Sequence, residues 1–145
     1  MDKLQIFPHV LALAAAFALA MPIGWDREKK ARSAGLRTFP LVALASCGFI
    51  QASESLLVNS PDGMSKVIEG LITGIGFIGG GAILKQGTTV LGTATAASLW
   101  ATGAIGVSVG LGSYDVAVTV AVFTFLTLKL LPLVKDDEDS GDEKD

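Results

Sequence analysis

The chain has 145 residues, of which 50% are apolar and only 17% are charged. About a quarter of the residues in an average soluble domain are charged, so the composition disfavours a water-soluble enzyme domain. The formal net charge of −3 hides two opposite regions, because residues 136–145 hold seven acids and one lysine while the rest of the chain is basic. The basic residues concentrate in one short segment, 27–37, which is typical of a membrane-orienting cluster and not of a nucleic-acid surface.

Five apolar runs follow one another along the chain, each close to the roughly 20 residues that cross a bilayer as a helix. The predicted spans are residues 6–23, 38–58, 67–84, 93–111 and 116–133. None of them alternates apolar and polar residues as a lipid-facing barrel strand does. The sequence therefore predicts an all-α membrane protein, with a compact bundle of about five transmembrane helices in residues 1–135.

The first run, 6–23, has an alternative interpretation as a cleaved signal peptide. The tripeptide Ala18-Leu19-Ala20 has the small-x-small form of a cleavage site. Cleavage there would send the basic segment 27–37 across the membrane, although Lys and Arg in short loops tend to stay cytoplasmic. We therefore expect an uncut first helix.

The distribution of basic residues predicts the orientation of the bundle. One side would carry the five basic residues of segment 27–37 together with Lys85, Lys129 and Lys135, whereas the other side would carry Lys3 and Lys66. The positive-inside rule then places the N-terminus outside and the C-terminus in the cytoplasm of a bacterial cell. Residues 136–145 contain no apolar residue to bury, so we expect a disordered acidic cytoplasmic tail.

Glycines and other small residues crowd the third and fourth runs, which predicts a glycine-rich third helix and a small-residue fourth helix. Pairs spaced four apart lie on one helical face, where they let two helices approach closely in lipid. The residues expected to pack helices are Gly70, Gly74, Gly76, Gly79, Gly80, Gly81, Gly106 and Gly110. The functional alternative is that the patch 79–81 unwinds and exposes backbone carbonyls in the membrane.

The segment 74–79 also matches the glycine spacing of a dinucleotide-binding loop. That loop requires a preceding strand, a following helix and a soluble helix start that meets the pyrophosphate. A membrane-length apolar run offers none of these, so the match predicts no nucleotide site. Before this run, residues 59–63 (Asn-Ser-Pro-Asp-Gly) predict a tight turn.

Charged residues at the edges of the apolar runs are the candidate functional residues, since a charge inside a bilayer costs several kcal/mol. Asp26, Arg27, Glu28 and Arg37 are expected to form a polar cluster at the cytoplasmic end. The other basic residues of the segment, including Lys30, should attract anionic headgroups. Arg37→Ala is then expected to harm folding or function more than Lys30→Ala.

Two carboxylates, Glu54 and Glu69, flank the connection between the second and third runs and are expected to face each other near the external mouth. Such a pair suits a weak association with Mg²⁺, which keeps several waters and uses one or two carboxylates. The alternative is that each is a solvated acid at the interface. No metal-ligand spacing and no acid, base and nucleophile set is present, so neither an enzyme nor a cofactor is predicted.

Several separated motifs resemble the MgtC/SapB family of bacterial inner-membrane proteins. The motifs that carry the resemblance are 23–28 (Ile-Gly-Trp-Asp-Arg-Glu), 34–38 (Ala-Gly-Leu-Arg-Thr), 74–81 (Gly-Ile-Gly-Phe-Ile-Gly-Gly-Gly) and 95–100 (Thr-Ala-Ala-Ser-Leu-Trp). The resemblance covers nearly everything from the first helix to the fifth. It implies the transmembrane domain only, without the soluble C-terminal domain that some relatives carry.

The resemblance implies a link to growth at low magnesium, stress adaptation in hosts and membrane-energy homeostasis. In this interpretation the protein regulates partner membrane proteins through its small-residue helix faces, surrounded by the lipid bilayer. A homodimer is a further option, and no nucleic-acid partner is implied. The alternative function is a small cation permease, for Mg²⁺ or a monovalent ion, whose path passes Glu54 and Glu69.

Overall fold

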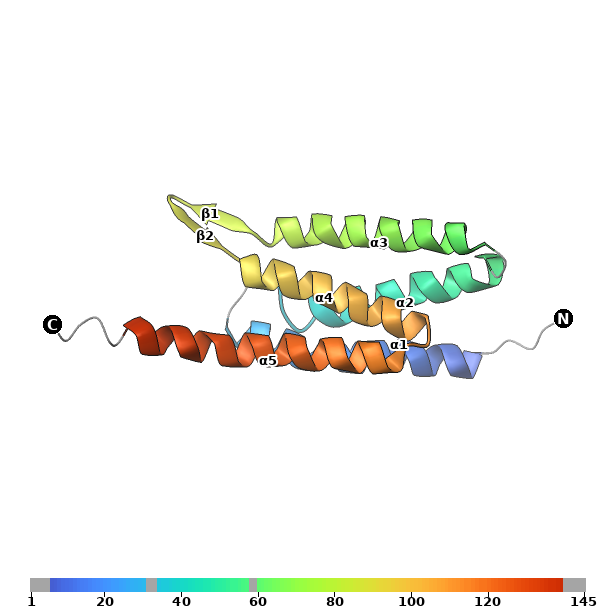
Figure 1. Cartoon of the computed structure of the whole chain (residues 1–145), viewed down its shortest axis with the longest axis horizontal. Coiled ribbons are helices and arrows are strands. Elements are labelled where there is room, and N and C mark those ends of the chain that lie inside the picture. The colour runs from blue at the N-terminus through green and yellow to red at the C-terminus, as the bar shows by residue number, and fades with distance from the viewer. Residues whose placement is uncertain (1–5, 31–33, 58–59, 140–145) are drawn as a thin grey trace.

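The computed structural model describes residues 6–30, 34–57 and 60–139, and within them the chain forms five helices and one β-hairpin (Figure 1). The elements in chain order are α1 (Ile6–Lys29), α2 (Thr38–Leu57), α3 (Pro61–Gly81), β1 (Leu84–Gln86), β2 (Thr89–Leu91), α4 (Thr93–Gly110) and α5 (Tyr114–Asp139). The predicted all-α bundle of five helices is confirmed.

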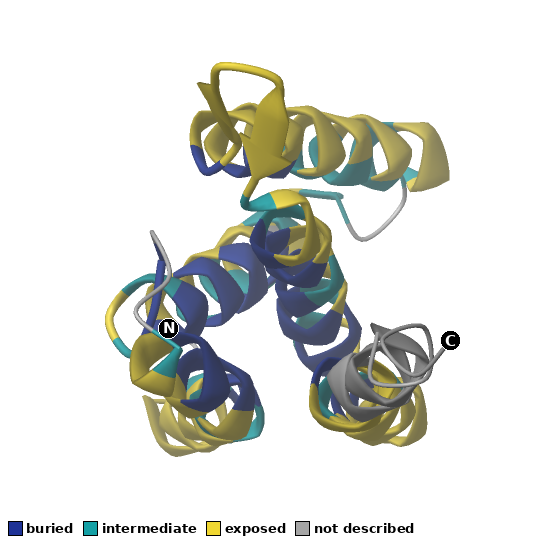
Figure 2. Ribbon diagram, turned by 90° about the vertical axis from the view of Figure 1, so that its left-hand side faces the viewer, coloured by how far each residue is buried: buried dark blue, intermediate teal, exposed yellow. Residues whose placement is uncertain are grey.

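The helices run up and down along one common direction, so the two ends of the chain lie at opposite ends of the bundle (Figure 1). Helix α4 occupies the centre and contacts α1, α2, α3 and α5. Helix α3 packs against α2 and α4 and forms an outer layer above them (Figure 2). This arrangement leaves most of the surface of α3 outside the bundle.

Large apolar side chains cover the outside of the bundle, which is the reverse of a soluble protein. Phe7, in the first turn of α1, is 79% exposed, and Phe77, in the C-terminal part of α3, is 85% exposed. Monomeric soluble proteins rarely expose such apolar surface without a partner. By length and mean hydropathy, α1 and the segment Tyr114–Leu131 of α5 are candidate membrane spans among the described helices.

The interior is packed through small residues. Ala12, Ala16 and Ala20 of α1 are almost fully buried at a four-residue spacing. On α4, an added Cβ at Gly106 would overlap the carbonyl oxygen of Ala43 in α2, and one at Gly110 would lie 2.7 Å from Cβ of Ile50. The backbones of α2 and α4 therefore touch where these glycines lie, as expected for helices associating in lipid.

Two buried hydroxyl groups of α4 are satisfied within their own helix, whereas the buried Thr95 Oγ1 has no hydrogen-bond partner among the described residues. Ser98 donates to the carbonyl of Thr95 at 2.9 Å, and Thr102 donates to the carbonyl of Ser98 at 2.8 Å. Such local bonds let small polar residues line a helix contact without needing a distant partner. They explain how a Ser- and Thr-rich helix occupies the centre of the bundle.

Several helix ends differ from the sequence-based expectation. Helix α1 continues to Lys29 instead of ending at residue 23. Its charged residues Asp26 and Arg27 pair with each other and are buried within the protein, so the helix need not end before them. The predicted turn at 59–63 is wrong for residues 61–63, which form the first turn of α3. Ser60 caps that turn by accepting a hydrogen bond from the Gly63 amide at 3.2 Å, and Pro61 occupies a first-turn position.

Three corrections concern the later elements. Helix α3 stays helical through Gly81, so the unwound patch at 79–81 is not observed. Residues 84–91 form a hairpin, because Gly87 adopts a positive φ of 61° in a two-residue turn. Helix α5 extends to Asp139, so residues 136–139 are helical where a tail was expected, while residues 140–145 of the tail lie outside the described residues.

The α2–α4 contact yields a stability prediction. Gly106→Ala should lower the free energy of unfolding by about 1–3 kcal/mol, the usual effect of overpacking, because the new methyl group meets the backbone of Ala43. Gly80→Ala is the matched control, since nothing lies within 4 Å of an added Cβ there. Thermal unfolding in mild detergent measures both variants. Equal stability of the two would contradict the close backbone contact.

Candidate functional site: a polar helix end and an open face of α3

A buried ion pair lies near the C-terminal end of α1. Asp26 is 5% exposed and Arg27 is 4% exposed. The Arg27 Nε donates a hydrogen bond to Asp26 Oδ2 at 3.1 Å, and the Arg27 Nη2 contacts the same oxygen. A buried charge is tolerated when it is paired and hydrogen-bonded, so the two residues hold each other inside the protein.

Lys30 completes this cluster by linking two helices. Its Nζ lies 3.2 Å from Asp26 Oδ1 and donates a hydrogen bond to the carbonyl oxygen of Leu128 in α5 at 2.9 Å. The carboxylate of Asp26 thus receives Arg27 on one oxygen and Lys30 on the other. This bridge ties the polar end of α1 to α5.

Glu28 has a separate role at the same end of the bundle. Its Oε2 accepts a hydrogen bond from the backbone amide of Leu36 at 3.1 Å. An added Cβ at Gly35 would overlap that carboxylate oxygen, so a glycine is needed for the approach. The bond fastens the α1–α2 connection back onto α1.

The position of Arg37 corrects the expected cluster. Arg37 is exposed, and no hydrogen bond or ion pair joins its guanidinium to any other residue that the structure describes. It lies at the end of a cavity between α2 and α3. Lys30, which was expected to face lipid headgroups, therefore takes the place beside Asp26 that was assigned to Arg37.

Glu54 on α2 and Glu69 on α3 are both exposed. Among the described residues, no group of three or more His, Cys, Asp or Glu side chains is arranged to hold a metal ion. The Mg²⁺ association expected at these carboxylates stays a prediction. By the 3.6-residue period of the helix, Glu69 shares a face of α3 with Thr73 and Gly76.

The glycines divide into two groups by what surrounds them. An added Cβ at Gly79 would lie 3.3 Å from the carbonyl oxygen of Ala96 in α4, and Gly106 and Gly110 contact α2 as described above. At the other glycines assigned to helix packing, no atom of residues 6–30, 34–57 or 60–139 lies within 4 Å of an added Cβ. These are Gly70, Gly74, Gly76, Gly80 and Gly81.

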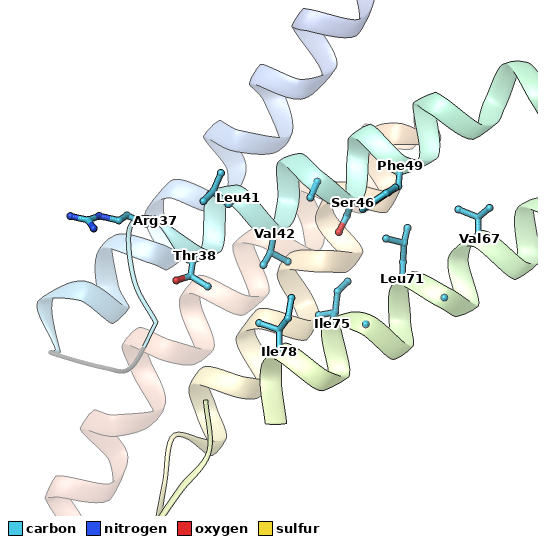
Figure 3. Close-up of a pocket in the computed structure, with 13 residues that line it drawn as sticks. Arg37, Thr38, Leu41, Val42, Ser46, Phe49, Val67, Leu71, Ile75 and Ile78 are labelled. Atoms are coloured by element: carbon cyan, nitrogen blue, oxygen red, sulfur yellow. The ribbon is translucent and has the colours of Figure 1, made fainter. Parts of the chain in front are cut away.

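The open glycines of α3 form two surfaces. Gly70 and Gly74 line the cavity between α2 and α3, which measures about 630 Å³ (Figure 3). Gly76 and Gly80 are exposed, and the helical period places them on the side of α3 that faces away from this cavity. We call the surface formed by Glu69, Thr73, Gly76 and Gly80 the outer face of α3.

Comparison with known proteins decides the family. The family model described as the MgtC family matches residues 13–136. The chain belongs to the MgtC family. It is 39% identical to protein MgtC of Salmonella typhimurium (strain LT2) over 121 residues, which is 83% of this chain and 51% of that protein.

A second relative of this MgtC-family chain is protein MgtC of Brucella abortus (strain 2308), 41% identical over 124 residues, which is 85% of this chain and 51% of that protein. The chain thus spans about half the length of the curated relatives it matches. No solved structure matches it.

Three features of this MgtC-family chain were not predicted from its sequence. The spacing of Asp26 and Lys30, four residues apart on one helix, is a recognisable ion-pair signal, but the pairing of Lys30 with α5 is not. Lys29 lies 5.2 Å from the ring centroid of Trp25, a cation–π contact at the same helix end. Local spacing could reveal that contact as well, whereas the cavity between α2 and α3 depends on how the helices diverge.

The Lys30 bridge generates a prediction opposite to the one made from sequence. Lys30→Met should lower the free energy of unfolding by about 1–2 kcal/mol, because Asp26 and the Leu128 carbonyl lose a charged donor. The effect is moderate because the Lys30 side chain is 33% exposed and partly screened by solvent. Arg37→Met should stay within about 0.5 kcal/mol of the parent. Thermal unfolding in detergent would refute the bridge if Arg37→Met proved the more damaging change.

Proposed function

We propose that this MgtC-family protein is a non-enzymatic regulator of other membrane proteins that acts when magnesium is limiting. The observation that carries the proposal is the outer face of α3. Gly76 and Gly80 lie four apart and are exposed, and in the described part of the chain nothing lies within 4 Å of an added Cβ at either position. In lipid, such small-residue faces promote close helix association, so this face suits a helix of a partner protein or of a second copy.

The neighbouring residues of the outer face support the same use. Thr73 donates its hydroxyl to the Glu69 carbonyl at 2.9 Å, so its polarity is satisfied within α3 while its methyl group adds a small apolar contact. Phe77, 85% exposed beside this face, offers a large side chain that a partner helix can cover. The outer face therefore lets a partner helix approach the backbone of α3 closely, and Phe77 beside it offers a large apolar side chain for the partner to contact.

The proposal includes a topology in the bacterial inner membrane. All five helices cross, with the N-terminus outside and the C-terminus in the cytoplasm. The support is the positive-inside rule together with the up-and-down arrangement of the helices (Figure 1). The buried pair of Asp26 and Arg27 then lies near the cytoplasmic boundary. There, the partly exposed Lys30 forms a second ion pair with Asp26.

The permease alternative has no specific support among the described residues. Glu54 and Glu69 are exposed, and the cavity between α2 and α3 is lined almost entirely by apolar side chains. A cation path needs polar groups that replace water around the ion. We therefore propose no bound cofactor and no transported ion, and we assign the regulatory role to helix contacts.

The outer face is tested by Gly76→Leu, with Gly74→Leu as the matched control on the cavity side. Both positions have open space in the chain, so both variants should fold. Gly76→Leu should weaken recovery of membrane partners by about tenfold, because a leucine keeps a partner helix at a distance, a change of roughly 1.4 kcal/mol. The measurement is affinity purification in mild detergent from cells grown at low Mg²⁺, with growth in the same medium as the second readout.

Gly74→Leu should retain both partner recovery and growth. Recovery of this chain alone, as a dimer lost in Gly76→Leu, would assign the outer face to self-association. Equal recovery and growth for the parent and Gly76→Leu would refute the regulatory use of the outer face.

A further inference from the structure

The cavity between α2 and α3 is a groove lined mainly by apolar residues of these two helices. Its volume of about 630 Å³ falls in the range of roughly 300–1,000 Å³ that is typical of small-molecule sites. Gly70 and Gly74 leave room along one wall, and Leu41, Val42 and Phe49 line the other (Figure 3). The groove therefore suits a slender apolar ligand.

The length of the groove matches one leaflet of a bilayer. Along α3 it extends from Val67 to Ile78, which at 1.5 Å per residue corresponds to about 16 Å. Half of a hydrocarbon core of about 30 Å is roughly 15 Å. A single extended acyl chain lying parallel to the helices fits this length.

Among the residues that the structure describes, Arg37 is the only charged one that lines the groove, and it lies at the end where α2 begins. Figure 3 shows the Arg37 side chain extending away from the groove at this end, while Val42, Ile75 and Ile78 lie between α2 and α3. The guanidinium has no partner among the residues that the structure describes. An arginine with a free planar fork at a membrane boundary is well suited to bind a phosphate group.

We propose that the groove between α2 and α3 binds one anionic phospholipid of the cytoplasmic leaflet, with an acyl chain beside Gly70 and Gly74 and the phosphate at Arg37. The site is independent of the partner contact on the outer face of α3, although it rests on the proposed orientation.

Native mass spectrometry of the full chain in an uncharged detergent tests the proposal, with phosphatidylglycerol and phosphatidylcholine as probes. The parent should bind one phosphatidylglycerol in preference to phosphatidylcholine. Arg37→Gln should weaken phosphatidylglycerol binding about fivefold, equivalent to roughly 1 kcal/mol for one basic residue near the headgroups. Lys85→Gln, which removes an exposed charge from the hairpin, is the matched control and should leave binding unchanged.

The acyl-chain part of the site is tested by Gly74→Leu, whose side chain would fill the groove, against Gly76→Leu on the outer face. Gly74→Leu should lose binding of both lipids, whereas Gly76→Leu should bind as the parent does. Equal binding by these two variants would overturn the site, and so would equal effects of Arg37→Gln and Lys85→Gln. A dimer lost in Gly74→Leu without any lipid change would assign the groove to a second copy and also overturn the proposal.

A failure of the lipid site leaves the proposed function separately testable. Partner recovery depends on Gly76, whereas lipid binding depends on Gly74 and Arg37. The two glycine variants are therefore each other's control in the two experiments.

Discussion

The structure depends on the direct contact between the backbones of α2 and α4. In lipid, burying apolar side chains between helices gains little, so close packing must hold the bundle together. Gly106 and Gly110 bring α4 against Ala43, Cys47 and Ile50 of α2 without intervening side chains. Because α4 also touches the other three helices, this contact fixes the centre around which they are arranged.

The polar end of α1 is the second constraint, and it works by different physics. Asp26 and Arg27 are buried as a pair, and removing Asp26 would leave the buried charge of Arg27 without its counter-ion. Lys30, which contacts Asp26, also donates a hydrogen bond to the backbone of α5. Glu28 accepts a hydrogen bond from the backbone amide of Leu36, just before α2. Small residues thus hold the middle of the bundle together by close packing. Charged residues hold its end together, where water also competes for their hydrogen bonds.

The sequence was sufficient to predict the five helices, because each is a long apolar run bounded by charges or turn residues. It was insufficient at the helix ends. Residues 26–28 looked like the exit from the membrane but continue α1, since their charges pair within the protein. Pro61 and Gly63 looked like a turn but start α3, because Ser60 caps the helix in front of them.

In the candidate site, only contacts between residues close in sequence on one helix could be predicted. Asp26 and Lys30 are four residues apart, so their contact is readable from the helical period. The place of Arg37 is not, because it depends on the angle at which α2 leaves the connection. The glycines of α3 show the same limit, since an identical four-residue spacing describes Gly70 and Gly74 in the groove and Gly76 and Gly80 outside it.

The two surfaces of α3 make this helix the point where lipid and protein contacts meet. The groove side and the outer face share one backbone, and α3 is held by contacts with α2 and α4 on one side. Nothing that the structure describes lies within 4 Å of an added Cβ at Gly74 or at Gly76, and the helical period places these two positions on opposite sides of α3. A side chain introduced on one side therefore leaves the other side unchanged, so the lipid site and the partner contact can be lost separately.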